Sequence, residues 1–472
     1  MIALTLAEIA AAVGGTLAGG ADPAAVVTGP VTFDSRTVAP GALFAAFDGA
    51  KVDGHDFAPA ALAQGAVAVL AGRDVGVPAI LVDDVRAALG GLARSVLSRL
   101  PQLTVVGITG SSGKTSTKDL LGQVLGAAGP TIAPRGSMNN ELGLPVTVLT
   151  ADEDTRFLVL EMGARGVGHI AYLCRIAPPR IGLVLNVGSA HVGEFGGKEV
   201  TAQAKGELVE SLPEHGLAVL NADDPLVAPM NNRTKAKVSY FGESPGARVR
   251  AESVSLDEDG RPTFTLVLDG AAVGKPVTLQ FAGEHQVANA LAAAAAALGA
   301  GMAPEQVGAA LSQAVPVSGG RMAISRRADG LTIVDDAYNA NPESVRAALK
   351  ALATMARARP GARAWAVLGA MLELGDRADE EHDAIGRLAV RLGIDRLVAV
   401  GDGAARIHAG AGQEGSWGEE SVMVADPPQA LALLRAEVRP GDVVLVKASN
   451  SVGLGWVARE LAQAPGAEAG AR

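Results

Sequence analysis

A glycine-rich turn that carries a lysine and a threonine is the first group of residues suited to chemistry. In VVGITGSSGKTSTKDLLGQVL, residues 105–125, an apolar strand-like segment leads through glycine and serine into a helix-like segment. The glycines let backbone N–H groups point inward at an anion, and the helix N-terminus adds its positive end. A lysine there reaches a β- or γ-phosphate, and a threonine hydroxyl binds Mg²⁺. A plain turn with a surface lysine is the alternative. The expected nucleotide-binding residues are Gly110, Ser111, Ser112, Gly113, Lys114 and Thr115.

Two further polar residues follow predicted strands in the same part of the chain. The apolar segment 157–160 ends at Glu161, and the segment 181–187 leads to His191. Ligands of open α/β sheets bind beyond the carboxyl ends of the strands. A carboxylate and an imidazole there would bind divalent metal beside a triphosphate. We therefore expect both to be metal ligands, with a solvated glutamate and a structural histidine as the alternative.

A third group lies in LTIVDDAYNANPESVRAAL, residues 331–349. Asn341 is suited to cap a helix that begins with Pro342. Asp335 and Asp336 at the strand end could be ordinary turn residues. Together with Tyr338 and the asparagines they are more typical of a ligand-binding surface, because they gather at the carboxyl end of a predicted strand.

Composition and charge limit the class of protein. The 472 residues predict about three domains, and 49% hydrophobic and 19% charged residues suit several packed cores. A net charge of −10 argues against nucleic acid as a partner. Cys174 is the single cysteine, which excludes intrachain disulfides and predicts a small buried hydrophobe.

The apolar segments do not read as targeting or membrane segments. The N-terminus carries Glu8 and no basic flank, and Thr5 with Glu8 predicts a capping box before a short helix that stops at Gly14. The alanine-rich segment 290–303 is too short to span a bilayer. We expect a cytoplasmic protein, with no membrane partner, that acts as a monomer.

These residues must be positioned by helices and strands, and the sequence pattern of those elements predicts an α/β fold with three domains. Residues 1–100 mix short strands and helices. In residues 101–315, strands alternate with helices as in a parallel sheet typical of phosphate-loop NTPases, and residues 249–280 predict a small antiparallel part before a helix over 287–298. Residues 316–472 predict a Rossmann-like domain. Its expected strands are 331–334, 365–368, 397–400 and 443–446.

Five motifs in one order resemble the Mur ligase superfamily. They are the phosphate loop, LEMGA at 160–164, NVGSAH at 186–191, AQAKGE at 202–207 and DDAYNANPES at 335–344. The resemblance covers essentially the whole chain. It implies an ATP-dependent ligase that uses Mg²⁺ and forms ADP and phosphate.

The resemblance also implies roles for individual residues. Lys114, Thr115, Glu161 and His191 match phosphate and metal ligands. Lys205, by default an exposed helix lysine, matches a lysine that is carbamylated in several members and then helps to bind a second Mg²⁺. Residues that match the ATP site are Asn289, Arg321, Asp336 and Tyr338, and residues that match the substrate sites are Asp34, Ser35, Arg36, Asn139 and Asn140.

Two segments resemble particular members of the family. Residues 33–57, FDSRTVAPGALFAAFDGAKVDGHDF, resemble a uridine-nucleotide domain, and NPES stands where ligases that add a diamino acid carry DNPR. The implied reaction joins D-alanyl-D-alanine to UDP-N-acetylmuramoyl-tripeptide through an acyl phosphate, in peptidoglycan precursor synthesis. The alternatives are a diamino-acid-adding or folylpolyglutamate-type ligase, or a phosphate-loop NTPase switch. Ala370 and Asn450 depart from the family pattern, so no residue is assigned to the dipeptide.

Overall fold

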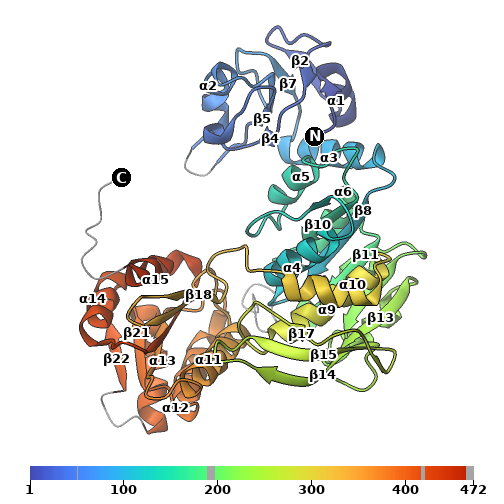
Figure 1. Ribbon diagram of the computed structural model, residues 1–472. Helices are drawn as coiled ribbons and strands as arrows, with labels where there is room; N and C mark the ends of the chain where they lie inside the picture. The colour runs from blue at the N-terminus through green and yellow to red at the C-terminus, as the bar shows by residue number, and fades with distance from the viewer. Residues whose placement is uncertain (50–51, 189–196, 416–419, 464–472) are drawn as a thin grey trace.

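The computed structural model describes residues 1–49, 52–188, 197–415 and 420–463, which form three α/β lobes (Figure 1). The N-terminal lobe contains a five-stranded sheet in the order β2-β7-β6-β5-β4 and a β1–β3 pair. Thr5 and Glu8 form the predicted capping box, and Gly14 ends that helix with a φ of 66°. The elements are β1 (Leu4–Thr5), α1 (Leu6–Val13), β2 (Thr16–Ala18), β3 (Val26–Val27), β4 (Val31–Thr32), β5 (Leu43–Ala45), α2 (Ala58–Ala63), β6 (Ala68–Ala71), β7 (Ala79–Leu81) and α3 (Val85–Ser98).

The central lobe is built on a ten-stranded sheet. Strands β8 to β13 pair in parallel, in the order β9-β10-β8-β11-β12-β13. Strands β14 and β15 form the predicted antiparallel part. Its strands are β8 (Thr104–Thr109), β9 (Thr131–Ile132), β10 (Phe157–Glu161), β11 (Ile181–Val184), β12 (Leu217–Asn221), β13 (Lys237–Gly242), β14 (Val249–Leu256), β15 (Pro262–Leu268), β16 (Ala271–Ala272) and β17 (Val277–Thr278). Its helices are α4 (Lys114–Gly126), α5 (Gly143–Val148), α6 (His169–Ile176), α8 (Lys198–Glu210), α9 (Gln286–Gly299) and α10 (Pro304–Gln313).

The C-terminal lobe contains a six-stranded sheet in the order β18-β19-β23-β20-β21-β22. All neighbouring pairs are parallel except β18–β19, as a Rossmann-like domain with one antiparallel edge strand requires. Its strands are β18 (Ala323–Arg326), β19 (Thr332–Asp335), β20 (Ala364–Leu368), β21 (Arg396–Val400), β22 (Ser421–Val424) and β23 (Val443–Lys447). Its helices are α11 (Pro342–Arg357), α12 (Ala378–Arg391), α13 (Ala405–Glu414), α14 (Pro427–Glu437) and α15 (Gly455–Ala462).

The predicted α/β fold class is confirmed, with two differences in the central lobe. The strand expected over 181–187 ends at Val184, because Asn186 leaves the sheet to bind the phosphate loop. Strand β13, which the sequence analysis did not predict, extends the parallel sheet beyond β12. The domain boundaries 1–100, 101–315 and 316–472 stay a prediction.

A buried ionic contact joins the central and C-terminal lobes. Asp259, in the turn between β14 and β15, is 4% exposed and pairs with Arg326 on β18 and with Arg359 just after α11. Breaking one partner of a buried ion pair leaves an uncompensated charge, so this contact constrains how the two lobes meet. Cys174 is buried, as predicted. Over the described ranges, we find no helix long and apolar enough to cross a membrane.

Candidate active site

The phosphate loop connects β8 to α4 and is held by residues from neighbouring strands. Gly113 has a φ of 81°, and a Cβ atom there would lie 2.5 Å from the Asn289 side-chain oxygen, so only glycine fits this turn without strain. The Ser112 N–H donates to the Asn186 side chain over 2.9 Å. The loop therefore has a fixed shape before any ligand binds.

Lys114 begins helix α4 and is half-buried at the loop. Its Nζ donates to the Gly110 carbonyl oxygen over 2.7 Å. Burial lowers the pKa of Lys114 and the nearby Arg321 lowers it further, whereas Glu161 opposes the shift. A phosphate bound at the loop would compete with the Gly110 carbonyl for the Lys114 ammonium group. The contact with the phosphate would be the stronger one, because both of its partners are charged.

Glu161 is the last residue of β10 and collects three donors. Its carboxylate accepts from the Thr115 hydroxyl over 2.8 Å, from Ser137 over 2.9 Å and from Asn139 over 3.0 Å. The residue is 2% exposed. A hydroxyl and a carboxylate side by side are oxygen ligands of the kind that Mg²⁺ prefers. His191, the other predicted metal ligand, lies outside the described residues.

Lys205 lies on α8 and is buried, in contrast to the default expectation of an exposed helix lysine. Its exposed fraction is 3%, and its pKa is lowered well below the usual value, first by burial and then by the Lys114 charge. A lowered pKa enlarges the neutral fraction of the amine, which has a free electron pair on nitrogen. This is the condition that carbamylation requires, although the modification itself stays a prediction.

The C-terminal lobe brings a second set of polar residues to the loop. Arg321 stacks on the Tyr338 ring at 4.4 Å from its centroid. Asp336 accepts from the Met322 N–H over 3.1 Å and pairs with Lys447 over 2.5 Å. Sequence reasoning missed Lys447, which is 2% exposed; a lysine closing the buried strand 443–446 was the available signal.

One side chain, that of Asn341, connects the two lobes directly at this site. Asn341 caps α11 as predicted, with its side chain accepting from the Ser344 N–H over 2.9 Å, and its amide also donates to the Ser111 carbonyl oxygen over 3.5 Å. Asn289 on α9 donates to Gln286 over 2.8 Å and faces Gly113. We call the resulting cavity of about 380 Å³ the nucleotide cavity. Its lining includes Ser111, Ser112, Gly113, Lys114, Thr115, Glu161, Asn289, Arg321, Asp336 and Tyr338.

A second cavity of about 470 Å³ lies between the central and N-terminal lobes. We call it the acyl cavity, and its lining includes Asn139, Asn140, Lys114, Lys205 and Arg86. Asn139 and Asn140 thus line the same cavity as Lys205, and their predicted place near the muramoyl peptide stays a prediction. Asp34, Ser35 and Arg36 are not among its described lining residues. They lie at the 3₁₀ turn Ser35–Thr37, where a hydrogen bond from Arg36 lowers the pKa of Asp34 to about 2.

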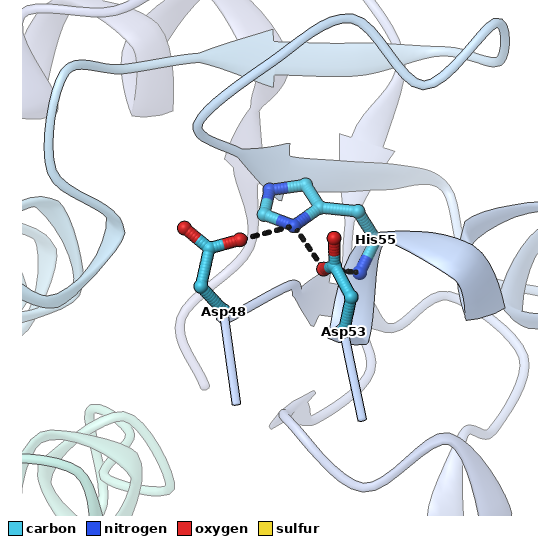
Figure 2. Close-up of side chains that lie close together, drawn as sticks. All are labelled: Asp48, Asp53 and His55. Atoms are coloured by element: carbon cyan, nitrogen blue, oxygen red, sulfur yellow. Dashed lines mark hydrogen bonds and ion pairs between the residues drawn. The ribbon is translucent and has the colours of Figure 1, made fainter. Parts of the chain in front are cut away.

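The N-terminal lobe also holds a cluster of Asp48, Asp53 and His55, whose ligand atoms lie within 4.8 Å of one another (Figure 2). The Gly72 N–H donates to His55 Nε2 over 3.1 Å, so the proton of the neutral ring is on Nδ1, which lies 2.7 Å from Asp53. A metal at Nδ1 would leave the ring with no proton. The cluster is therefore a structural one.

The sequence matches three domain families in chain order. The Mur ligase family catalytic domain matches residues 30–96, the Mur ligase middle domain matches 108–297, and the Mur ligase glutamate ligase domain matches 320–450. This chain belongs to the Mur ligase family. The resemblance drawn from the five motifs is thereby confirmed, and the predicted class of enzyme, a ligase, with it.

This Mur ligase has similar relatives over its whole length. It is 53% identical to the UDP-N-acetylmuramoyl-tripeptide–D-alanyl-D-alanine ligase of Mycobacterium tuberculosis, over 98% of each chain. A crystal structure of MurF from Acinetobacter baumannii has a TM-score of 0.87 and 31% identity, over 98% of this chain and 99% of that one. MurF ligase from Thermotoga maritima, solved with ADP, has a TM-score of 0.79 and 32% identity, over 92% and 97%.

The residues of this Mur ligase fit the phosphate groups of a bound nucleotide. The Arg321 Nε atom is buried and has no hydrogen-bond partner among the residues that the structure describes. A buried guanidinium nitrogen without a partner is costly unless a ligand satisfies it, and a phosphate would do so. The oxygen atoms of Thr115 and Glu161 fit a hard cation beside that phosphate.

Proposed function

We propose that this Mur ligase joins D-alanyl-D-alanine to UDP-N-acetylmuramoyl-tripeptide and converts ATP to ADP and phosphate. One observation carries the proposal: Lys114 and Asn139 line both the nucleotide cavity and the acyl cavity. A phosphoryl group bound at the loop would therefore meet a carboxylate bound in the acyl cavity at these two side chains. Full-length relatives that bear this substrate name support the assignment.

The chemistry explains why both cavities must meet. A carboxylate does not react with an amine until its oxygen becomes a leaving group, which transfer of the ATP γ-phosphoryl group achieves. The neutral amine nitrogen then attacks the acyl carbon, the bond between that carbon and the phosphate oxygen breaks, phosphate leaves with the electron pair, and the nitrogen releases a proton. Lys114 would stabilise the negative charge on the phosphoryl group during its transfer. A charged donor lowers the energy of the transition state most in a site that excludes water.

Thr115 and Glu161 would hold Mg²⁺, with His191 as a further proposed ligand and Lys205, once carbamylated, as a ligand of a second ion. Bound Mg²⁺ neutralises phosphate charge and so supplies electrostatic stabilisation during phosphoryl transfer. Asn289, Arg321, Asp336 and Tyr338 would bind or close over the nucleotide. Asn139 and Asn140 would contact the muramoyl peptide, and Asp34, Ser35 and Arg36 would border the uridine end of the same substrate.

The proposal is tested by ADP release with each amine donor offered singly, with and without the nucleotide-linked tripeptide. We expect ADP release to require both UDP-N-acetylmuramoyl-tripeptide and D-alanyl-D-alanine. L-alanyl-L-alanine should react far more slowly, because a misplaced methyl group displaces the attacking nitrogen, and small displacements cost rate steeply.

The competing functions give different results in the same assay. A diamino-acid-adding ligase would turn over faster with free diaminopimelate or lysine, and a folylpolyglutamate-type ligase with glutamate. A phosphate-loop NTPase switch would release phosphate without either co-substrate. Any of these outcomes would contradict the proposed substrate pair.

Replacing Glu161 with glutamine is expected to raise the Mg²⁺ concentration for half-maximal activity by about tenfold or more, because one anionic oxygen ligand is lost. The measurement is a Mg²⁺ titration of ADP release at fixed saturating substrates. Glu153→Gln removes the same charge from an exposed residue of the same lobe and serves as the control. An unchanged Mg²⁺ requirement in Glu161→Gln would return Glu161 to a structural role as the partner of Thr115.

We also propose that the enzyme acts as a cytoplasmic monomer. The support is chemical: its proposed co-substrate ATP is made and kept inside the cell, and its one cysteine suits a reducing compartment. Light scattering of the purified chain measures the oligomeric state directly.

A further inference from the structure

Arg321 reaches the nucleotide cavity at the end of a linker that joins the central and C-terminal lobes. The linker covers residues 315–320, between α10 and β18, and runs from one lobe to the other (Figure 1). It contains neither helix nor strand, and its valines, Val315 and Val317, are 49% and 40% exposed. Apolar burial therefore contributes little to the path of the linker, and polar contacts must fix it.

The first of these contacts comes from Gln123, on the phosphate-loop helix α4. Its amide group pairs with both polar groups of the Val315 backbone. Nε2 donates to the Val315 carbonyl oxygen over 2.8 Å, and Oε1 accepts from the Val315 N–H over 3.0 Å. Gln123 thus binds the start of the linker as a neighbouring strand would, although the two residues are 192 positions apart in the sequence.

A second contact holds the middle of the linker. The Gly136 N–H donates to the Ser318 hydroxyl oxygen over 3.3 Å. Gly136 precedes Ser137, whose hydroxyl donates to the Glu161 carboxylate over 2.9 Å. The linker is therefore also tied to the segment that reaches Glu161.

The end of the linker is fixed to the C-terminal lobe. The Tyr338 N–H donates to the Gly320 carbonyl oxygen over 3.2 Å, and the Met322 N–H donates to Asp336 over 3.1 Å. Met322 has a φ of 52°, in the left-handed region that residues with side chains rarely adopt, so these contacts hold a strained backbone. Arg321 consequently lies between two anchors, one on each lobe.

Arg321 needs such support because it lies beside another cation. Burial lowers the pKa of Lys114 and the Arg321 charge lowers it further, so the two side chains repel each other before a phosphate binds. The Arg321 guanidinium stacks on the Tyr338 ring, and its buried Nε has no hydrogen-bond partner in the described part of the chain. The backbone that carries Arg321 must therefore set its distance from the phosphate loop.

We propose that Gln123 is a positioning residue: by binding Val315 it holds the linker on α4 and keeps Arg321 at the nucleotide phosphates. Lys114 begins the same helix, so α4 supplies one phosphate ligand directly and fixes another through the linker. Gln123 is not among the described lining residues of the nucleotide cavity. This inference rests on the part of the proposed function that places nucleotide phosphates at the loop, and it adds a residue that acts through Arg321.

The first test compares the affinities of wild-type enzyme and Gln123→Leu for the non-hydrolysable β,γ-imido analogue of ATP, by isothermal titration calorimetry with Mg²⁺ present. Leucine keeps the helix propensity of glutamine but removes both contacts with Val315, so the Kd should rise by about fivefold or more. Gln123→Glu, whose carboxylate repels the Val315 carbonyl oxygen, should also raise the Kd. An unchanged Kd in both variants would overturn the proposal.

The matched control is Gln313→Leu. Gln313 is exposed at the end of α10, two residues before the linker begins. The substitution is chemically the same, and the Kd for the analogue should stay within about twofold of the wild-type value. A loss equal to that of Gln123→Leu would show that any leucine near the linker weakens binding, which would overturn the specific role of Gln123.

A double variant asks whether Gln123 acts through Arg321. Arg321→Ala should weaken binding of the analogue on its own. Adding Gln123→Leu to Arg321→Ala should then change the Kd by less than about twofold, because residues that act through one contact are not additive. If Gln123→Leu costs the same factor in both backgrounds, Gln123 supports the central lobe in general, and its positioning role is refuted.

Amide hydrogen exchange tests the contact itself in solution. The Val315 amide should exchange faster by about tenfold or more in Gln123→Leu than in wild-type enzyme, whereas the melting temperature should change little because Gln123 is only half-buried. Equal exchange rates would show that other groups hold the linker and would contradict the proposal. The binding and exchange measurements contain neither the tripeptide nor an amine donor. A different substrate pair in the ADP-release assay would therefore refute the proposed function and leave the test of Gln123 standing.

Discussion

Turnover is expected to fall by about a hundredfold or more in Lys114→Ala, because one charge-assisted contact to the transferring phosphoryl group is lost in a buried site. Lys114 is the side chain best placed for this contact, since it begins α4, lies at the phosphate loop and lines both the nucleotide and acyl cavities. The loss should appear in kcat more than in the KM for the dipeptide, because the lost contact forms with the phosphoryl group and not with the amine co-substrate.

The fold of Lys114→Ala should stay intact, because Lys114 is only half-buried and its truncation removes, among the described residues, a single hydrogen bond, to the Gly110 carbonyl oxygen. Circular dichroism and thermal melting would establish this before kinetics are compared. Lys275→Ala, a change at an exposed lysine of the same lobe, is the matched control and should behave as wild type. Near-normal turnover in folded Lys114→Ala would contradict the assignment of residues 110–115 as a phosphate-binding loop.

A second lysine of the same helix, Lys118, has a structural role. Lys118 is fully buried, and its ammonium binds the Pro134 and Gly136 carbonyl oxygens and pairs with Asp119 over 2.7 Å. It holds the segment that delivers Ser137 and Asn139 to Glu161. The sequence GKTSTK therefore contains one lysine that is placed to bind a ligand and one that stabilises the fold. The sequence alone does not show which lysine has which role.

Features that depend on neighbours in sequence could be predicted from the sequence. The capping box of Thr5 and Glu8, and the Asn341–Pro342 start of α11, follow from side chains that bind backbone groups three residues away. The alternation of strand and helix segments is also a pattern of sequence neighbours, and it predicted the parallel sheets. The resemblance then supplied residue roles that periodicity does not contain.

Features that depend on distant contacts could not be predicted. The strand expected over 181–187 stops at Val184 because Asn186 binds Ser112, which lies 74 residues earlier. Lys205 was an exposed lysine by default, since AQAKGE carries no sign of the packing that buries it. Lys447 was missed because its partners, Asp336 and Asn339, are 111 and 108 residues away.

The burial of Lys205 leads to the second large expected effect. Burial and the Lys114 charge lower the pKa of Lys205 well below its usual value, so above that lowered pKa the amine is neutral. A neutral amine attacks the carbon of CO₂ and loses a proton, which leaves a carbamate with two oxygen atoms. Formation of the carbamate therefore increases as pH rises, and the product is an anionic oxygen ligand where the unmodified lysine offers none.

Lys205→Ala is accordingly expected to lose about a hundredfold or more of the wild-type turnover, because a metal ligand is absent. Millimolar acetate or formate should restore part of it by supplying a carboxylate to the space that the side chain left. Lys198→Ala, at an exposed position of the same helix, should lose little activity and gain nothing from added carboxylate.

The modification also has a readout that is independent of turnover. Wild-type enzyme equilibrated with ¹³C-bicarbonate should show a protein-bound carbamate carbon by NMR, increasing with pH as the proton balance requires, and Lys205→Ala should lack that signal. Lys198→Ala should retain it, because exposed lysines stay protonated near neutral pH and do not compete for CO₂. A spectrum without the carbamate signal in wild-type enzyme, or full turnover in Lys205→Ala, would show that Lys205 acts as an unmodified side chain and that the second metal site must be built from other residues.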